Sequence, residues 1–237
     1  MQSIGALNGI HYSPANKKLP FQGSVLKSIA KGSAITAGVF SAVTSADLVL
    51  TKGNALNTLS GGKISYIKTM NEDIETVLEK DPAAKGRIEV MLCYPGVHAL
   101  WTHRIAHKLY EWKIPVIPRL ISNISRIFTN IEIHPGAKIG HKVFIDHTGL
   151  LVGETAEIGD GCELIENVVL GGVSKEKKKR HPTLEENVQV GCGARIIGNF
   201  TVGKNSKIGA NSVVLKEVPP NSTMVGIPAK AVSRNED

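Results

Sequence analysis

The sequence predicts a parallel β-helix that follows a helical region, and two observations carry this prediction. Aliphatic residues recur every six positions through much of the C-terminal half, and glycine directly follows seven of the thirteen. In a hexapeptide repeat each unit forms a short strand and a turn, and its aliphatic side chain points into the coil. Glycine beside that residue relieves crowding or permits a positive φ at the corner. The aliphatic positions are Ile133, Ile139, Ile145, Val152, Ile158, Leu164, Leu170, Leu184, Val190, Ile196, Val202, Ile208 and Val214.

Residues 70–130 are predicted to form helices ahead of the coil. Asn71 begins a segment whose early acidic residues suit a helix N-terminus. Asp81 stands directly before a proline and is predicted to cap a second helix. A third helix follows the break at Pro95, and a fourth follows Pro118, each with apolar residues at helical spacing.

The remaining regions are defined by composition. Residues 131–215 form the predicted coil, and residues 216–237 are a tail, because Pro219 and Pro220 cannot donate to a strand ladder. Residues 1–69 are an atypical basic extension, predicted to be poorly ordered, with an organelle transit peptide as the alternative.

The hexapeptide period is interrupted twice, and each interruption carries a histidine beside a charged residue. The first adds one residue in the segment that contains Asp146 and His147. The second adds eight residues and contains Arg180 and His181. An uninterrupted repeat would need neither insertion, so we expect the functional residues at these two breaks.

Composition limits the class of protein. The net charge of +7 is concentrated in residues 1–69, which hold seven Lys and one Asp and therefore carry +6. The rest of the chain holds 21 basic and 20 acidic residues, which leaves +1 and argues against nucleic-acid binding through overall basicity. No run of 18 apolar residues suggests a membrane span. Three cysteines without metal spacing predict free thiols and a reducing, cytoplasmic location.

Several motifs stand in a fixed order along residues 70–232. They are Asp81-Pro82-Ala83-Ala84, Tyr94-Pro95-Gly96-Val97-His98-Ala99-Leu100, Glu132-Ile133-His134-Pro135-Gly136-Ala137-Lys138-Ile139-Gly140, Ile145-Asp146-His147, Gly153-Glu154-Thr155, Leu170-Gly171-Gly172, Arg180-His181-Pro182 and Gly226-Ile227-Pro228-Ala229-Lys230. Together they resemble the serine O-acetyltransferase family of hexapeptide-repeat acyltransferases. The resemblance implies a left-handed parallel β-helix with a helical N-terminal cap. It also implies acetyl transfer from acetyl-CoA to L-serine, giving O-acetylserine for cysteine biosynthesis, with feedback inhibition by cysteine. Acetyl-CoA is then a co-substrate, and no cofactor is bound permanently.

The resemblance implies that His147 is the general base and Glu132 its partner. An imidazole titrates near neutral pH and can remove the serine hydroxyl proton. A carboxylate on the far ring nitrogen fixes the tautomer and stabilises the imidazolium. Glu132 stands where the family usually has Asp, and the loop after His147 is one residue shorter than usual. The alternative for His147 is a structural histidine in a turn.

The resemblance also implies a serine site of opposite charges. Arg180 and His181 would belong to the serine site, where the Arg180 guanidinium suits the carboxylate because it can donate two parallel hydrogen bonds to it. Asp81 and Asp146 would receive the ammonium group. The alternative for each is an ordinary loop or cap residue. Charges of both signs would select a zwitterionic amino acid over a neutral sugar.

The acetyl-CoA pantetheine is implied to lie against turns of the coil at Gly172, Cys192 and Ala210. The family usually has Ala at the position of Cys192. No metal site is expected. His103 and His107 are four residues apart on a predicted helix, but the Glu of a zinc-protease motif is absent, so two exposed histidines are the prediction.

Three expectations concern partners and rival functions. The resemblance implies a homotrimer or hexamer with the active site between subunits, and neither a nucleic acid nor a membrane as partner. A stable complex with O-acetylserine sulfhydrylase is doubtful, because the chain ends in Asp237 where many family members have an apolar Ile. The rival functions are another hexapeptide acyltransferase with a sugar or amine acceptor, and a non-catalytic trimeric scaffold.

Overall fold

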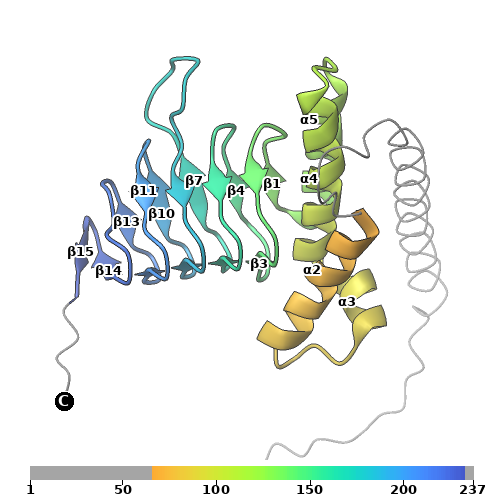
Figure 1. The fold of residues 1–237 in the computed structure, drawn as a ribbon, viewed down its shortest axis with the longest axis horizontal. Helices are drawn as coiled ribbons and strands as arrows, with labels where there is room; N and C mark the ends of the chain where they lie inside the picture. The colour runs from red at the N-terminus through yellow and green to blue at the C-terminus, as the bar shows by residue number, and fades with distance from the viewer. Residues whose placement is uncertain (1–65, 233–237) are drawn as a thin grey trace, which may run out of the picture. The chain divides into compact units, whose positions relative to one another are not determined.

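The computed structural model of the protein describes residues 66–232. The predicted N-terminal extension as far as residue 65, and the last five residues with the expected sulfhydrylase tail, lie outside the described residues. The described chain consists of helices at one end and a coil of short strands that leads away from them (Figure 1). Within residues 66–232, no helix has both the length and the apolarity needed to cross a bilayer.

Helices come first, as the sequence predicts, although two boundaries differ from those expected. The first helix begins before Asn71, and Asp81 caps a turn rather than a helix: its Oδ1 accepts the Ala83 N–H at 2.8 Å. The next helix starts only after Gly86. The helices are α2 (Tyr66–Lys80), α3 (Arg87–Cys93), α4 (Pro95–Glu111) and α5 (Ile117–Thr129).

The helices are joined to one another and to the coil by buried contacts. The Asp73 carboxylate of α2 pairs with the Arg104 guanidinium of α4 at 2.8 Å, and both groups are largely buried. Thr102 of α4 shares a hydrogen bond of 2.7 Å with Ser125 of α5. The hydroxyl of Ser122 donates to the carbonyl of Ile133 in the first strand of the coil. This cap is therefore fixed to the β-helix rather than tethered to it.

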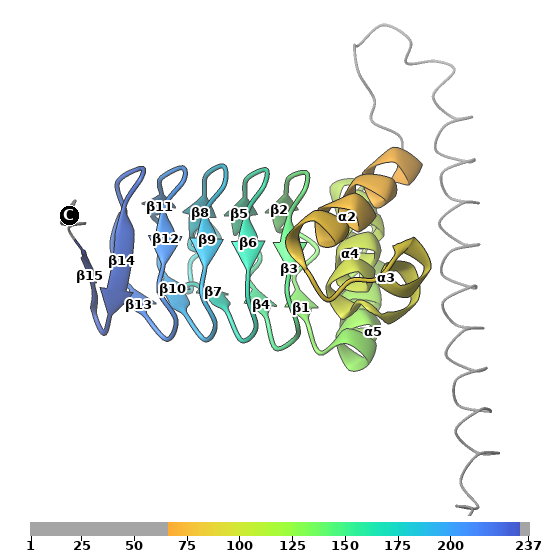
Figure 2. The same ribbon diagram turned by 90° about the horizontal axis from the view of Figure 1, so that it is seen from below.

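The coil is a parallel β-helix in which every third strand belongs to the same sheet (Figure 2). Its strands are β1 (Glu132–Ile133), β2 (Lys138–Ile139), β3 (Phe144–Ile145), β4 (Leu151–Val152), β5 (Glu157–Ile158), β6 (Glu163–Leu164), β7 (Val169–Gly171), β8 (Thr183–Leu184), β9 (Gln189–Val190), β10 (Arg195–Ile197), β11 (Thr201–Val202), β12 (Lys207–Ile208), β13 (Val213–Val214), β14 (Thr223–Gly226) and β15 (Ala229–Ala231). The first sheet has the order β1-β4-β7-β10-β13, the second β11-β8-β5-β2, and the third β15-β14-β12-β9-β6-β3.

Most of the predicted site residues lie along two edges of this coil. The turns that lead from the third sheet to the first form what we call the third–first corner. The turns that lead from the first sheet to the second form the first–second corner. Each successive turn of the coil adds one tight turn to each corner, so residues far apart in sequence are stacked along an edge.

The aliphatic ladder predicted from the period fills the coil. Twelve of the thirteen predicted positions are buried, and Ile139 in the first turn of the coil is partly buried. Side chains such as Leu164, Leu170 and Ile196 are fully enclosed. Burying a side chain of this kind contributes about 1.5–3 kcal/mol relative to exposure. The hexapeptide prediction is confirmed.

Six of the seven glycines that follow ladder residues relieve crowding, because an added Cβ would lie within 3.0 Å of another atom; Gly171 is the exception. A Cβ on Gly140 would lie 2.2 Å from a carboxylate oxygen of Asp160, and one on Gly203 would lie 2.4 Å from the nitrogen of Pro220. Neither glycine is among those with a positive φ. Positive φ falls instead on residues such as Asn187 and Asn205, consistent with the tolerance of Asn for the left-handed region. Of the two roles expected for these glycines, close approach is the one the fold uses.

The coil continues past residue 215, where the tail was expected to begin. Pro219 and Pro220 lie in a turn, where no ladder donor is needed, and the third sheet then resumes with β14. The Lys207 N–H donates to the Ser222 carbonyl at 2.8 Å, and β15 folds back antiparallel on β14. The hairpin closes the exposed end of the β-helix.

His103 is buried, and the prediction that it would be exposed is wrong. It is 5% exposed, because α4 turns this face toward the start of the coil, whereas His107 remains partly exposed. Burial lowers the pKa of His103 to about 3, and the neighbouring His107 and Arg104 add to the effect. Helical spacing shows that His103 and His107 share one face of α4, but it does not show that the coil covers part of that face.

Acid should destabilise the fold through His103. Its folded pKa lies below the unfolded value of about 6.5, so below that pH the unfolded chain binds a proton that the folded chain does not. Stability should therefore fall by about 1.4 kcal/mol per pH unit as the pH drops from 6.5 toward 5. Urea unfolding at pH 7.5, 6 and 5 would measure this loss. The His103→Gln variant should show a shallower pH dependence, and an unchanged slope would contradict the assignment.

Candidate active site

His147 lies in the third–first corner, in the turn after β3 that the first interruption enlarges. Its φ is 65°, in the left-handed region that a non-glycine residue seldom adopts. The side chain is 69% exposed. Other turns of the coil also hold a residue with positive φ, such as Asn167 and Asn211, so the backbone follows the fold. What distinguishes His147 is an imidazole that is open to a ligand.

Asp146 and Asp81 lie near His147, and Tyr94 is bound to Asp81. Its Nε2 lies 3.6 Å from Oδ1 of Asp146, and its charge contributes to lowering the pKa of Asp81. The Tyr94 hydroxyl donates to Oδ2 of Asp81 at 2.6 Å, and this hydrogen bond is the main cause of the lowered Asp81 pKa. The same bond raises the pKa of Tyr94 to about 12. Burial raises the pKa of Asp146.

The helical cap brings this cluster together. Asp81 follows α2 and Tyr94 precedes α4, whereas Asp146 and His147 belong to the coil. The junction is Gly96 of α4, where a Cβ would lie 2.2 Å from the carbonyl oxygen of Ile145. Three predicted site residues are thus assembled in one place. Tyr94 was not among the predicted site residues, because its place in the sequence before Pro95 does not show that its hydroxyl reaches Asp81.

In this chain the ion pairs of Glu132 are with residues other than His147. The Glu132 carboxylate pairs instead with two guanidinium groups of α5, with Arg126 at 3.1 Å and with Arg119 at 3.4 Å. Within residues 66–232, the carboxylate that pairs with His147 is that of Asp146. Two permanent positive charges hold the Glu132 carboxylate against α5. The role of Glu132 in a dyad stays a prediction.

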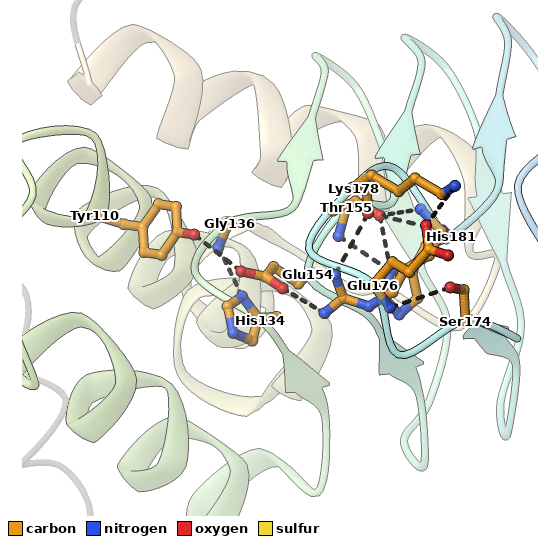
Figure 3. A network of polar contacts seen from close by, with 10 residues as sticks. Tyr110, His134, Gly136, Glu154, Thr155, Ser174, Glu176, Lys178 and His181 are labelled. Carbon is orange, nitrogen blue, oxygen red and sulfur yellow. Dashed lines mark hydrogen bonds and ion pairs between the residues drawn. The ribbon is translucent and has the colours of Figure 1, made fainter.

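Arg180 and His181 lie in the first–second corner, at the base of the long loop between β7 and β8. Figure 3 shows the polar network around them. The Arg180 guanidinium forms a short ion pair with Glu154, whose other oxygen accepts from the Tyr110 hydroxyl at 3.1 Å. The hydrogen bond from Arg180 is the main cause of a lowered Glu154 pKa. The ring of Tyr110 meets that of His134 edge-on, with centroids 5.9 Å apart.

The two predicted halves of the serine site occupy different edges of this chain. Asp81, Asp146 and His147 gather where the third sheet passes to the first, whereas Arg180 and His181 lie where the first passes to the second. The long loop projects from the coil above β7, away from β3 (Figure 1). Within one chain the acidic and basic halves therefore do not meet.

The residues predicted to line the acetyl-CoA groove divide in the same way. Cys192 and Ala210 lie in third–first turns, further along the edge that carries His147. The Cys192 thiol donates to Glu166 at 3.3 Å, and this hydrogen bond raises the thiol pKa. Gly172 lies instead against Arg180, whose carbonyl oxygen would be 2.9 Å from a Cβ there.

Within residues 66–232, the cysteines form neither a disulfide nor part of a metal site. All three thiols are free; Cys162 is buried, whereas Cys93 is exposed at the end of α3. Across residues 66–232, no group of three His, Cys, Asp or Glu side chains is arranged to hold a metal ion.

The coil is similar to the repeats of a known transferase family. The family model described as bacterial transferase hexapeptide (six repeats) matches residues 181–216. With the coil and its two interrupted corners, this match defines the chain as a hexapeptide-repeat transferase.

Individual relatives narrow the class. A serine acetyltransferase of Synechococcus elongatus is 52% identical over 169 residues, which cover 71% of this chain and 69% of the relative. The Neisseria gonorrhoeae serine acetyltransferase in complex with serine superposes with a TM-score of 0.68 at 38% identity, over 71% of this chain and 69% of that one. A serine acetyltransferase in complex with cysteine gives 0.71 at 39% identity, over 78% and 75%. In another structure of the Neisseria gonorrhoeae enzyme, the matched part spans 66% of that chain.

The chain belongs to the serine acetyltransferase family. Its coil is accordingly the left-handed β-helix expected from the resemblance, with a helical N-terminal cap.

Replacing Gly96 should separate the cap from the coil. The added methyl of Gly96→Ala would clash with a backbone carbonyl, so we expect a loss of about 1–3 kcal/mol in the free energy of unfolding. The matched control is Gly86→Ala, where nothing lies within 4 Å of the new methyl and φ is an extended 166°. The control should be neutral or stabilise by about 0.4–1 kcal/mol. Thermal unfolding of both variants measures these effects. Equal stabilities would count against a close approach of Gly96 to the Ile145 carbonyl.

Proposed function

We propose that this chain transfers the acetyl group of acetyl-CoA to the hydroxyl of L-serine, giving O-acetylserine and CoA. The observation that carries the proposal is the exposed His147, held beside Asp146 and Asp81 in a member of the serine acetyltransferase family. A relative of known structure binds serine, and another binds cysteine. Acetyl-CoA enters only as a co-substrate.

His147 acts as the base. Its imidazole removes the hydroxyl proton of serine while the oxygen attacks the thioester carbonyl carbon. The carbon–sulfur bond then breaks, and the proton on His147 passes to the departing CoA thiolate. No acyl-enzyme forms, since the acetyl group moves directly between the two substrates. Asp146, next to the imidazole, stabilises the positive charge that His147 carries between these steps.

The charged residues select an amino acid as acceptor. Asp81 and Asp146 attract the ammonium group, and the Arg180 guanidinium with the His181 ring holds the carboxylate. Glu154 fixes the Arg180 side chain but uses only part of its donors, because a guanidinium has five N–H groups. A neutral sugar would leave both charged halves without a partner, which disfavours the rival acceptor.

The serine site is completed between subunits. Because the two halves occupy different corners of one chain, the third–first corner of one subunit must face the first–second corner of a neighbour, as in a homotrimer. An apolar face of α5 supports such an assembly, since its side chains are 46–75% exposed in the single chain. They are Ile117, Leu120, Ile124, Ile127 and Phe128. A hexamer would be two such trimers.

The acetyl-CoA groove follows from the same assembly. Cys192 and Ala210 extend the edge that carries His147, and Gly172 of the neighbouring subunit would approach it together with Arg180 and His181. The pantetheine then lies along stacked turns, where backbone groups rather than side chains bind it.

Loss of the base should stop the chemistry. We expect His147→Ala to lower kcat by at least about 100-fold with little change in acetyl-CoA affinity. His141→Ala is the matched control, because this histidine of the first coil pairs with Glu72 outside the site and should remain active. Thiol release from acetyl-CoA, with serine compared against a sugar acceptor, measures both. Near-normal turnover without His147 would remove it from the mechanism, and turnover with the sugar alone would favour the rival enzyme.

Arg180 should affect serine and cysteine together. Losing the guanidinium removes a charge-assisted contact to a carboxylate that both amino acids carry, so Arg180→Ala should raise the serine KM and the cysteine inhibition constant, each by about 10- to 100-fold. Lys177→Ala removes one positive charge from the same loop and should change neither strongly. Persistent cysteine inhibition in a variant that no longer binds serine would show that the two ligands do not share this site.

A further inference from the structure

The strongest unassigned feature is the hydroxyl of Thr155, which lies at the centre of the contacts around His181. Its Oγ1 accepts the backbone N–H of Arg180 at 2.9 Å and that of His181 at 3.1 Å. The same oxygen lies 2.9 Å from Nδ1 of the His181 ring. Thr155 and His181 are labelled side by side in Figure 3.

These contacts determine where the hydroxyl hydrogen points. A threonine oxygen has two lone pairs and one hydrogen. Both lone pairs are occupied by the two backbone N–H groups, so the hydrogen is left for the third neighbour, Nδ1 of His181. The backbone N–H of Thr155 donates to the same ring nitrogen at 3.2 Å. Two independent donors therefore require Nδ1 to carry a lone pair and no proton.

The proton of the neutral ring must then be on Nε2. Burial lowers the pKa of His181, and the Arg180 charge lowers it by more than the Glu154 carboxylate raises it, so the neutral ring predominates near pH 7. A proton added to Nδ1 would also face the Thr155 N–H directly. The tautomer is thus imposed by contacts on the far side of the ring.

The Nε2–H group is the one polar part of the ring that remains available. His181 is only 8% exposed, yet no described residue bonds Nε2, and this atom is not among the unpartnered ones sealed from solvent in residues 66–232. Glycines flank it: a Cβ would lie 2.1 Å from Nε2 at Gly153 and 3.1 Å at Gly172. Side chains at these positions would cover the donor.

We propose that Thr155 is a positioning residue that holds His181 as a neutral hydrogen-bond donor through Nε2, directed at a carboxylate oxygen of the bound amino acid. The identity of this ligand rests on the function proposed above. The adjacent Arg180 backbone is fixed by the same hydroxyl, so one threonine aligns both donors to the carboxylate. His181 takes up no proton during the reaction, because its only basic nitrogen is occupied by Thr155.

The first test measures the tautomer without any assay of activity. Nitrogen-15 NMR of the full-length protein with labelled histidines, the His181 signals being assigned from His181→Ala, should show an unprotonated Nδ1 and a protonated Nε2 near pH 7. The tautomer is read from the wild-type protein, and the variant serves only to assign the signals. A protonated Nδ1, or a rapidly exchanging mixture, would overturn the proposal.

The second test separates positioning from a purely structural role. Thr155→Val keeps the shape but removes the hydroxyl, and it should give a mixture of tautomers together with a serine KM raised about tenfold, while the acetyl-CoA KM stays within about twofold. Thr155→Ser restores the hydroxyl and should recover both the tautomer and the KM. Wild-type serine binding in the valine variant, or no recovery with serine, would count against the proposal.

The outcomes also distinguish this inference from the proposed function. If the wild-type protein shows the expected tautomer but does not acetylate serine, the proposed activity fails and the role of Thr155 in fixing His181 stands. If serine is acetylated and the tautomer is the opposite one, the function stands and the role of Thr155 falls.

Discussion

The constraint on which the rest of the structure depends is the stacking of one enclosed aliphatic residue per strand. In the first sheet Ile133 pairs with Val152, Val152 with Leu170, and Leu170 with Ile196. A shift of one residue in any strand would turn its aliphatic side chain outward and a polar one inward. The ladder therefore fixes the register of every strand, and through it the position of every turn. The site residues in the corner turns are therefore positioned by the same ladder that forms the core.

Much of the fold follows from the sequence because this repeat is local. A period of six specifies strand, turn and burial without knowledge of distant residues, and its two breaks located His147, Arg180 and His181. Counting three strands per coil would also have separated these residues into two corners. The site contacts that were missed join distant segments: Tyr94 reaches Asp81, thirteen residues away, and the Thr155 hydroxyl reaches His181, twenty-six residues away.

The helical cap was harder to predict for the same reason. Periodicity in a helix shows which side chains share a face, but a face is buried only where another element covers it. His103 became buried against the coil, and Glu132 turned toward two arginines of α5. The pair between Asp73 and Arg104 is a further case: burial raises the Asp73 pKa although a guanidinium lies beside it, so desolvation outweighs the attraction. Single-residue properties could not show any of these arrangements.

The pairing of equivalent strands sets the step by which such a chain can change in length. Arg195 stands opposite Val213 and Gln189 opposite Lys207, a spacing of eighteen residues in each case. An insertion or deletion within a strand would disturb the ladder unless it removed or added a whole turn of the coil. The corners tolerate other lengths: the turn at His147 holds one extra residue, so that Ile133 pairs with Val152 nineteen residues away, and the loop between β7 and β8 holds eight. The coil can therefore lengthen or shorten only by whole turns, whereas its corner loops can change by single residues. A new specificity can arise in such a loop without disturbing the stacked aliphatic residues.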